Sequence, residues 1–201
     1  MMLIPIFISI LFSSCTKFVF FSETNDTYHY GILKNINDTM TENPQIALDM
    51  LNDFSKSDDK NKLSKSEFIE YNILIAEALY KCDSVITNKS TLNDIVIYLD
   101  SLTNQHPQNK DLLFINSKAH YYRGAGYEED YKYKDSFIDY LESLKLIEKI
   151  TFFSNDNNRN IIHFNALIYV RLSDILYWLD VYNASIECLN KANQLFDIER
   201  N

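Results

Sequence analysis

Apolar residues recur every three or four positions from about Ser22 to the end of the chain, the spacing of one buried face of an α-helix. The breaks between these stretches are filled by Asn, Asp, Ser and Pro, which interrupt or cap helices. The pattern therefore predicts an all-α fold. The expected helices cover approximately residues 26–41, 44–54, 64–82, 91–105, 110–124, 134–150, 161–179 and 182–198.

Local signals support several of these helix ends. Asn43-Pro44 places a capping residue before a proline at the first helical position. Ser90 or Thr91 caps the fourth helix, and His106-Pro107 ends it. Eight helices joined by short loops are expected to form four antiparallel pairs. Such pairs bury their apolar faces by stacking on one another as a solenoid.

Two stretches resemble the tetratricopeptide repeat, a 34-residue helix pair with small residues at its positions 8, 20 and 27. The clearest copies are residues 117–150 and 166–199, separated by the insert 151–165. Their small residues are Gly124, Ser136 and Ser143 in the first copy, and Ser173, Ser185 and Ala192 in the second. Position 32, usually Pro, holds Glu148 and Asp197. The resemblance implies a short right-handed superhelix over residues 26–201.

In tetratricopeptide arrays the first helix of each pair lines a concave groove. The resemblance therefore implies a groove for a protein or peptide partner, formed by Lys118, Tyr121, Glu128, Asp174, Tyr177 and Trp178, with Ala125, Glu129, Leu167 and Val170 beside them. Tyr and Trp suit such a groove because they combine a large contact area with a polar tip. For Trp178, core packing against the next helix is an equal alternative.

The N-terminus has the features of an export signal. Residues 1–14 carry no charge, and residues 3–12 form an apolar run with the length of a signal-peptide core, too short to cross a bilayer. Phe12-Ser13-Ser14-Cys15 resembles the lipobox of bacterial lipoproteins. The resemblance implies a signal peptide at 1–14, fatty acylation of Cys15 with palmitate-type chains, and a tether at 15–25. The alternative is an uncleaved anchor from Met2 to Phe21.

The lipobox resemblance also implies a location. A lipid on Cys15 would hold the protein in the envelope of a Gram-negative bacterium. Surface-exposed lipoproteins of some of these bacteria carry acidic residues after the lipidated cysteine, whereas Thr16-Lys17 follows here. The periplasm-facing side of the outer membrane is therefore favoured.

Composition and motifs exclude several functions. The 28 acidic residues outnumber the 19 basic ones, giving a net charge of −9, which disfavours nucleic acid binding. The four histidines have no carboxylate or cysteine at metal-ligand spacing, and Gly124-Ala125-Gly126 lacks the third glycine of a phosphate loop, so it is interpreted as a packing site and turn. The acidic run 128–130 is expected to face solvent at a helix start. We predict no metal, no cofactor and no enzymatic activity.

Two functional hypotheses remain. The first is a membrane-anchored helical-repeat scaffold that mediates protein–protein interaction in the cell envelope. The second is an envelope lipoprotein that binds a small molecule or a glycan. Leu179, Ile186 and Phe196 on the last helix pair have no capping helix after them, which adds self-association as an option. Cys82 and Cys188 are expected to pack in the core rather than form a disulfide.

Overall fold

The computed structural model describes residues 28–153 and 158–200, and over these residues it contains helices and no strand. The all-α prediction is thus confirmed for the described chain. The elements are α1 (Tyr28–Glu42), α2 (Pro44–Lys56), the 3₁₀-helix η1 (Asp58–Lys62), α3 (Lys65–Lys81), α4 (Lys89–Gln105), α5 (Lys110–Glu129), α6 (Tyr133–Phe153), α7 (Arg159–Trp178) and α8 (Tyr182–Arg200). None of these helices has the length and apolar character needed to span a membrane.

Side-chain caps define several helix starts. The Asn43 side chain accepts a hydrogen bond from the Ile46 N–H at 3.2 Å, and Pro44 is the first residue of α2. Ser64 and Glu67 form a reciprocal capping box at the start of α3. These caps satisfy backbone N–H groups that have no partner within the helix.

Two predicted helix ends are wrong. α4 begins at Lys89 after the N-cap residue Asn88, so neither Ser90 nor Thr91 caps it. Gly124-Ala125-Gly126 forms no turn, because α5 continues through it to Glu129. A Cβ atom on Gly124 would lie 3.2 Å from the Asp139 Cβ and from the Tyr140 ring on α6. Glycine at this position therefore permits a close approach between α5 and α6 rather than a change of direction. The expected loop after α2 also differs, since residues 58–62 form η1.

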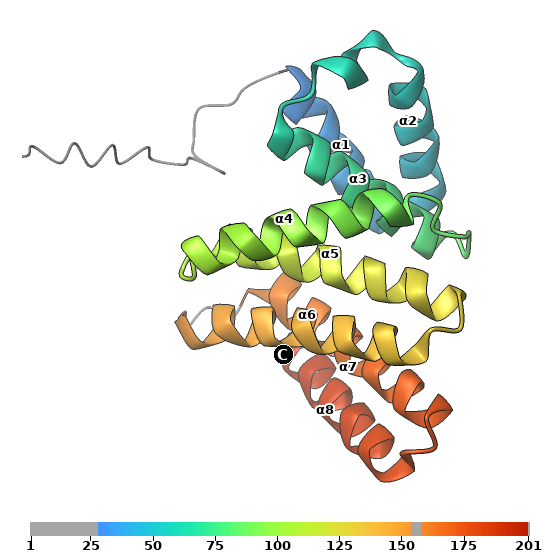
Figure 1. Cartoon of the computed structure of the whole chain (residues 1–201), viewed down its shortest axis with the longest axis vertical. Helices are drawn as coiled ribbons and strands as arrows, with labels where there is room; N and C mark the ends of the chain where they lie inside the picture. Colours follow the sequence, from blue (N-terminus) through green and yellow to red (C-terminus); the bar gives the residue numbers. More distant parts are fainter. Residues whose placement is uncertain (1–27, 154–157, 201) are drawn as a thin grey trace, which may run out of the picture.

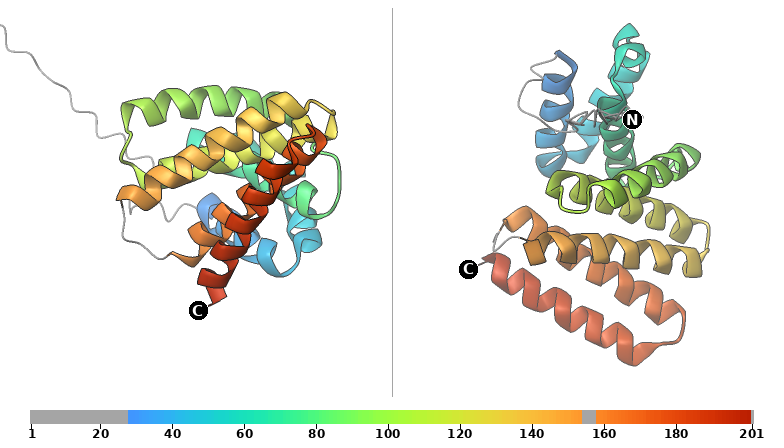
Figure 2. Two further views of the ribbon diagram at one scale, coloured as in Figure 1. Left: turned by 90° about the horizontal axis from the view of Figure 1, so that it is seen from below. Right: turned by 60° about the vertical axis from the view of Figure 1, so that its left-hand side comes forward.

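The helices follow one another along the molecule in chain order, from α1–α3 at one end to α7–α8 at the other (Figures 1 and 2). α5 packs along α6, and α7 packs along α8, whereas α3 meets α4 over a small area. Instead α3 packs against α1, α2 and α5, and α4 packs against α5. α3 therefore contributes to two cores, a smaller one with α1 and α2 and a larger one with α4–α7.

The small residues of the two repeat-like stretches lie where paired helices meet. The Ser117 hydroxyl donates to the Ser143 carbonyl oxygen and the Ser143 hydroxyl to the Ser117 carbonyl oxygen, each at 2.9 Å. In the second pair, the Ser173 hydroxyl donates to the Ser185 carbonyl oxygen at 2.9 Å. All four serines are buried. Small side chains at these positions thus allow α5–α6 and α7–α8 to pack closely.

Candidate functional site

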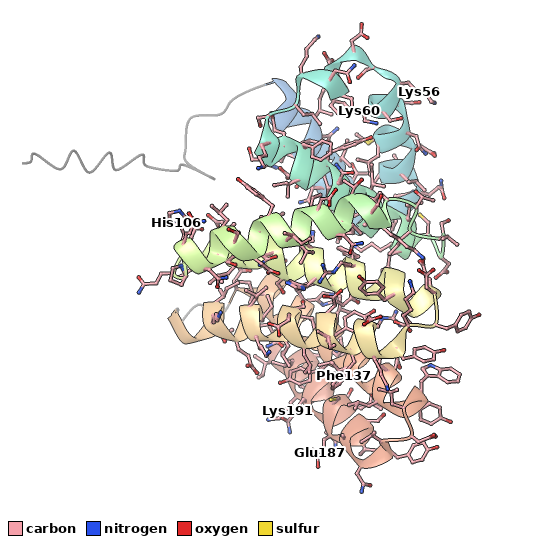
Figure 3. The ribbon with its side chains drawn as sticks, in the orientation of Figure 1. Lys56, Lys60, His106, Phe137, Glu187 and Lys191 are labelled. Atoms are coloured by element: carbon pink, nitrogen blue, oxygen red, sulfur yellow. The ribbon has the colours of Figure 1, made fainter. Side chains whose placement is uncertain are left out.

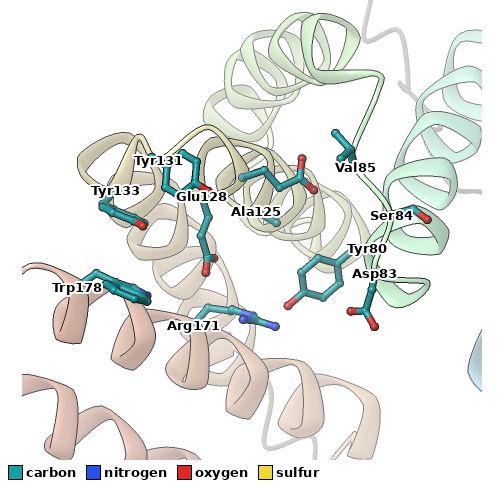
Figure 4. A pocket seen from close by; sticks show the side chains of 11 residues that line it. Tyr80, Asp83, Ser84, Val85, Ala125, Glu128, Tyr131, Tyr133, Arg171 and Trp178 are labelled. Carbon is teal, nitrogen blue, oxygen red and sulfur yellow. The ribbon is translucent and has the colours of Figure 1, made fainter.

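A pocket of about 440 Å³ opens where α3, α5 and α7 end (Figure 4). Its volume lies in the range of ligand-binding pockets. The aromatic lining residues are Tyr80, Tyr131, Tyr133 and Trp178, the charged ones are Asp83, Glu128, Glu129 and Arg171, and the remainder are Ser84, Val85 and Ala125. The pocket is therefore built from helix ends and the turns that follow them.

The ends of α3, α5 and α7 share one backbone motif. In each, the residue after the C-cap has a positive φ: 50° at Asp83, 59° at Tyr131 and 62° at Asp180. In each turn, the N–H of this residue and the N–H of the next one donate to carbonyl oxygens of the last helical turn; the next residues are Ser84, Lys132 and Val181. This is the Schellman motif. It recurs 48 and 49 residues apart, at the ends of the three helices that border the pocket.

A continuous aromatic ridge borders the pocket. The Tyr133 and Trp178 rings stack in parallel, with centroids 6.0 Å apart and planes inclined by 3°. Tyr131 meets Tyr133 edge-on at one side, while Tyr177 contacts both Trp178 and Tyr182 at the other. Tyr131 is 79% exposed and Trp178 is 59% exposed. Core packing of Trp178, the alternative from sequence, is therefore wrong.

Arg171 lies at the centre of the polar lining. Its guanidinium carbon is 5.1 Å from the centroid of the Tyr80 ring, and its Nη1 donates to the Asp174 Oδ2 at 3.2 Å. Burial raises the pKa of Asp174, and the neighbouring guanidinium partly offsets this. Arg171 and Asp174 thus form a locally compensated pair on α7.

The prediction that the acidic run at residues 128–130 lies at a helix start is wrong. The run lies at the C-terminal end of α5, where the helix macrodipole disfavours carboxylates. Lys89 offsets this cost through ion pairs with Glu129 at 3.1 Å and Asp130 at 2.7 Å. Both Glu129 carboxylate oxygens also accept from the Ile86 N–H at 3.1 Å.

Glu128 is the half-buried member of this run. Its Oε2 accepts a hydrogen bond from the Tyr140 hydroxyl at 3.0 Å. Burial raises the pKa of Glu128, while the Tyr140 hydroxyl and the more distant Arg171 act in the opposite direction. This carboxylate therefore faces the pocket with a neutral hydrogen-bond donor as its direct partner.

The structure places part of the predicted groove at this pocket. Trp178, Glu128, Ala125 and Glu129 line it. Tyr177 belongs to the aromatic ridge, and Asp174 is linked through Arg171.

Two predicted groove residues lie elsewhere, Tyr121 buried and Lys118 partly buried. Tyr121 is only 2% exposed and packs among other aromatic rings. Lys118 forms an ion pair with buried Glu77. Although burial alone would raise the pKa of Glu77, the ammonium groups of Lys118 and Lys81 lower it to about 2. Both Tyr121 and Lys118 therefore contribute to packing and charge compensation in the interior.

Sequence reasoning missed Tyr80, Arg171 and the turn residues that line the pocket, which are Asp83, Ser84, Val85, Tyr131 and Tyr133. The clustering of Tyr131 and Tyr133 in a short polar connection is the signal that points to the turn.

Cys15 lies outside the described residues. Cys82 and Cys188 are both free thiols and partly buried. No group of His, Cys, Asp and Glu side chains suited to a metal ion occurs in the described part of the chain.

Comparison of the chain with protein-family models, curated proteins and solved structures gives no match.

Proposed function

We propose that this chain is a membrane-anchored helical-repeat scaffold that binds a segment of another envelope protein across the ends of α3, α5 and α7. The pocket and its aromatic ridge form the binding surface. Exposed Tyr and Trp side chains at the border of a pocket are typical anchors for protein partners. Glu128, Tyr177 and Trp178 take the binding roles that the tetratricopeptide resemblance implies, with Tyr131 and Tyr133 added by the geometry.

The observation that carries this proposal is the conformation of Tyr131. Its φ of 59° lies in the left-handed region, which costs a residue with a side chain about 1–2 kcal/mol and which glycine adopts freely. The Tyr131 side chain is also highly exposed, so it gains little from the core. A bulky side chain at a position where glycine is more stable supports a role in contacts outside the fold.

Photo-crosslinking tests the proposal in cells that produce the protein. A benzophenone amino acid in place of Val85, which lines the pocket and is 64% exposed, is expected to give a discrete protein adduct. The Tyr131→Gly substitution should reduce the yield of this adduct by about 10-fold, the effect of losing one anchor residue. The same substitution should raise the melting temperature by a few degrees, because it relieves the left-handed strain.

Ile97 provides the matched control, since it is 67% exposed on α4 and does not line the pocket. The crosslinker at this position should give no adduct. An equal yield from both positions, or an adduct that Tyr131→Gly leaves unchanged, would refute the proposed surface. Absence of any adduct from position 85 would count against a protein partner.

The parallel stack of Tyr133 and Trp178 favours a second candidate function, the binding of a glycan or small molecule against an exposed ring face. Trp178 is the only tryptophan of the chain, so its fluorescence reports directly on this pocket. Saturable quenching by an oligosaccharide, together with the absence of a crosslinked protein, would select this function instead.

Anchoring through Cys15 is a separate part of the proposal, supported by the apolar leader and the lipobox-like residues before this cysteine. Mass spectrometry of the N-terminus from membrane fractions should find a chain that begins at Cys15 and carries a diacylglycerol. The Cys15→Ala variant should lose both the cleavage and the lipid, and thus the stable membrane attachment. An uncleaved Met1 in the wild-type protein would contradict lipid anchoring and favour the uncleaved anchor.

A further inference from the structure

The pocket carries more negative than positive charge. Its lining holds the three carboxylates Asp83, Glu128 and Glu129 and one cation, Arg171. Lys89 and the Ile86 N–H already bind Glu129. Asp174 already binds Arg171, which also stacks on Tyr80.

Glu128 and Asp83 are consequently left without an ionic partner. Neither forms an ion pair within 4 Å with a residue in the described ranges 28–153 and 158–200. Arg171 is turned toward Asp174 and Tyr80, so it is poorly placed to bind an anionic ligand as well. A ligand that enters this pocket therefore meets two carboxylates that form no ion pair of their own, with Arg171 acting on Glu128 only from a greater distance, and charge complementarity favours a cation.

The pocket walls also favour a cation. The face of an aromatic ring attracts a guanidinium or an ammonium group within about 6 Å of its centroid. Tyr131, Tyr133 and Trp178 supply such rings at the entrance, close to the Glu128 carboxylate (Figure 4). Tyr80 already binds the Arg171 guanidinium in this manner inside the same pocket.

We propose that the pocket binds the side chain of an arginine or lysine that belongs to an extended segment of a partner protein. Glu128 is the counter-ion, and Trp178 and Tyr131 are the aromatic walls. A peptide is favoured over a free small cation because the aromatic ridge continues beyond the pocket to Tyr177 and Tyr182, which gives flanking residues a contact surface. This inference rests on the proposed function and specifies the chemistry of its partner.

Peptide display on the immobilised full chain tests the inference. A random library should yield binders that share one Arg or Lys, and their affinity can be measured through Trp178 fluorescence. Replacing that Arg with citrulline, which is neutral and almost isosteric, should weaken binding by about 10-fold or more. Glu128→Gln should weaken binding of the Arg peptide by a similar factor but leave the citrulline peptide nearly unaffected. The glutamine side chain can still accept from the Tyr140 hydroxyl, which preserves the local fold.

Glu187→Gln is the matched control, because Glu187 is an exposed glutamate on α8 that does not line the pocket (Figure 3). It should leave the affinity for the Arg peptide within about twofold of wild type. Circular dichroism melting of both variants shows whether each is folded.

Different results would overturn the cationic ligand and the protein-binding function. Binders that need Trp178 but show no preference for a basic residue would overturn the cationic ligand and leave the protein-binding function intact. A library without any binder that depends on Trp178 would argue against both. Arginine amide or spermidine that binds as tightly as the peptide would overturn the assignment to a partner segment and indicate a small-cation site.

Discussion

Replacing Asp139 with Asn is expected to lower the free energy of unfolding by about 3–5 kcal/mol, the cost of breaking a buried ion pair. Asp139 on α6 is 1% exposed. Its carboxylate accepts two hydrogen bonds from Arg123, at 2.7 and 2.6 Å, and contacts the His120 Nδ1 at 2.9 Å. An asparagine would retain one acceptor oxygen and direct an NH₂ group at neighbouring donors. It would thus remove the ion-pair partner of the Arg123 guanidinium and leave His120 with Asp100 alone.

Urea denaturation followed by circular dichroism at neutral pH measures this loss. Glu142→Gln on the same helix is the control, because Glu142 pairs with Lys145 at the surface and exposed pairs contribute at most about 1 kcal/mol. A loss of less than 1 kcal/mol for Asp139→Asn would show that the buried network does not stabilise the fold.

The pH dependence identifies the contribution of His120 to this network. Burial alone would lower the pKa of His120, but hydrogen bonds to Asp100 and Asp139 outweigh burial and raise it above its ordinary value of 6.5. A raised pKa in the folded state means that the stabilisation is complete below pH 6.5 and is lost as the pH rises through the folded-state pKa. The stability difference between wild type and Asp139→Asn should therefore shrink toward alkaline pH. A difference that grows instead would contradict a protonated His120.

The contact between His120 and Asp139 is a feature that the sequence alone does not reveal. His120 is isolated in the sequence because its partner Asp139 is 19 residues away and lies on a different helix. Their contact depends on how α5 and α6 are rotated about their axes. The helices themselves are predictable because each depends on local information, such as the apolar spacing and the caps at Asn43 and Ser64.

Only some of the residues that line the pocket are predictable from the sequence, because the others depend on contacts between distant segments. Trp178 and Glu128 lie on helices, and their positions in the repeat assign them to the helix face that is expected to line a groove. Both line the pocket. Asp83 and Tyr131 lie in turns, where hydrophobic periodicity gives no direction for a side chain. Tyr121 was misplaced because α5 contacts α3, α4 and α6 and is buried on several sides, so no single face of it marks a groove.

The position of Tyr121 leads to the second large effect, since its substitution should damage the fold rather than the binding surface. Tyr121→Ala is expected to lower the free energy of unfolding by about 3–5 kcal/mol, as in other large-to-small changes at buried aromatic residues. The Tyr121 ring lies between those of Phe164, at 5.1 Å, and Tyr140, at 5.4 Å, and it joins α5 to α6 and α7. Removing the ring would leave a cavity where three helices meet.

The exposed Tyr177 is the appropriate comparison, because it is a tyrosine from the same predicted groove that lies on the aromatic ridge. Tyr177→Ala should change the free energy of unfolding by only about 0.5 kcal/mol, as is usual at the surface, and instead reduce the crosslinking yield of the pocket. Thermal melting should separate the two variants by on the order of 10 °C. Similar melting temperatures would mean that Tyr121 is not a core residue, and the predicted groove would then extend along α5 to include it.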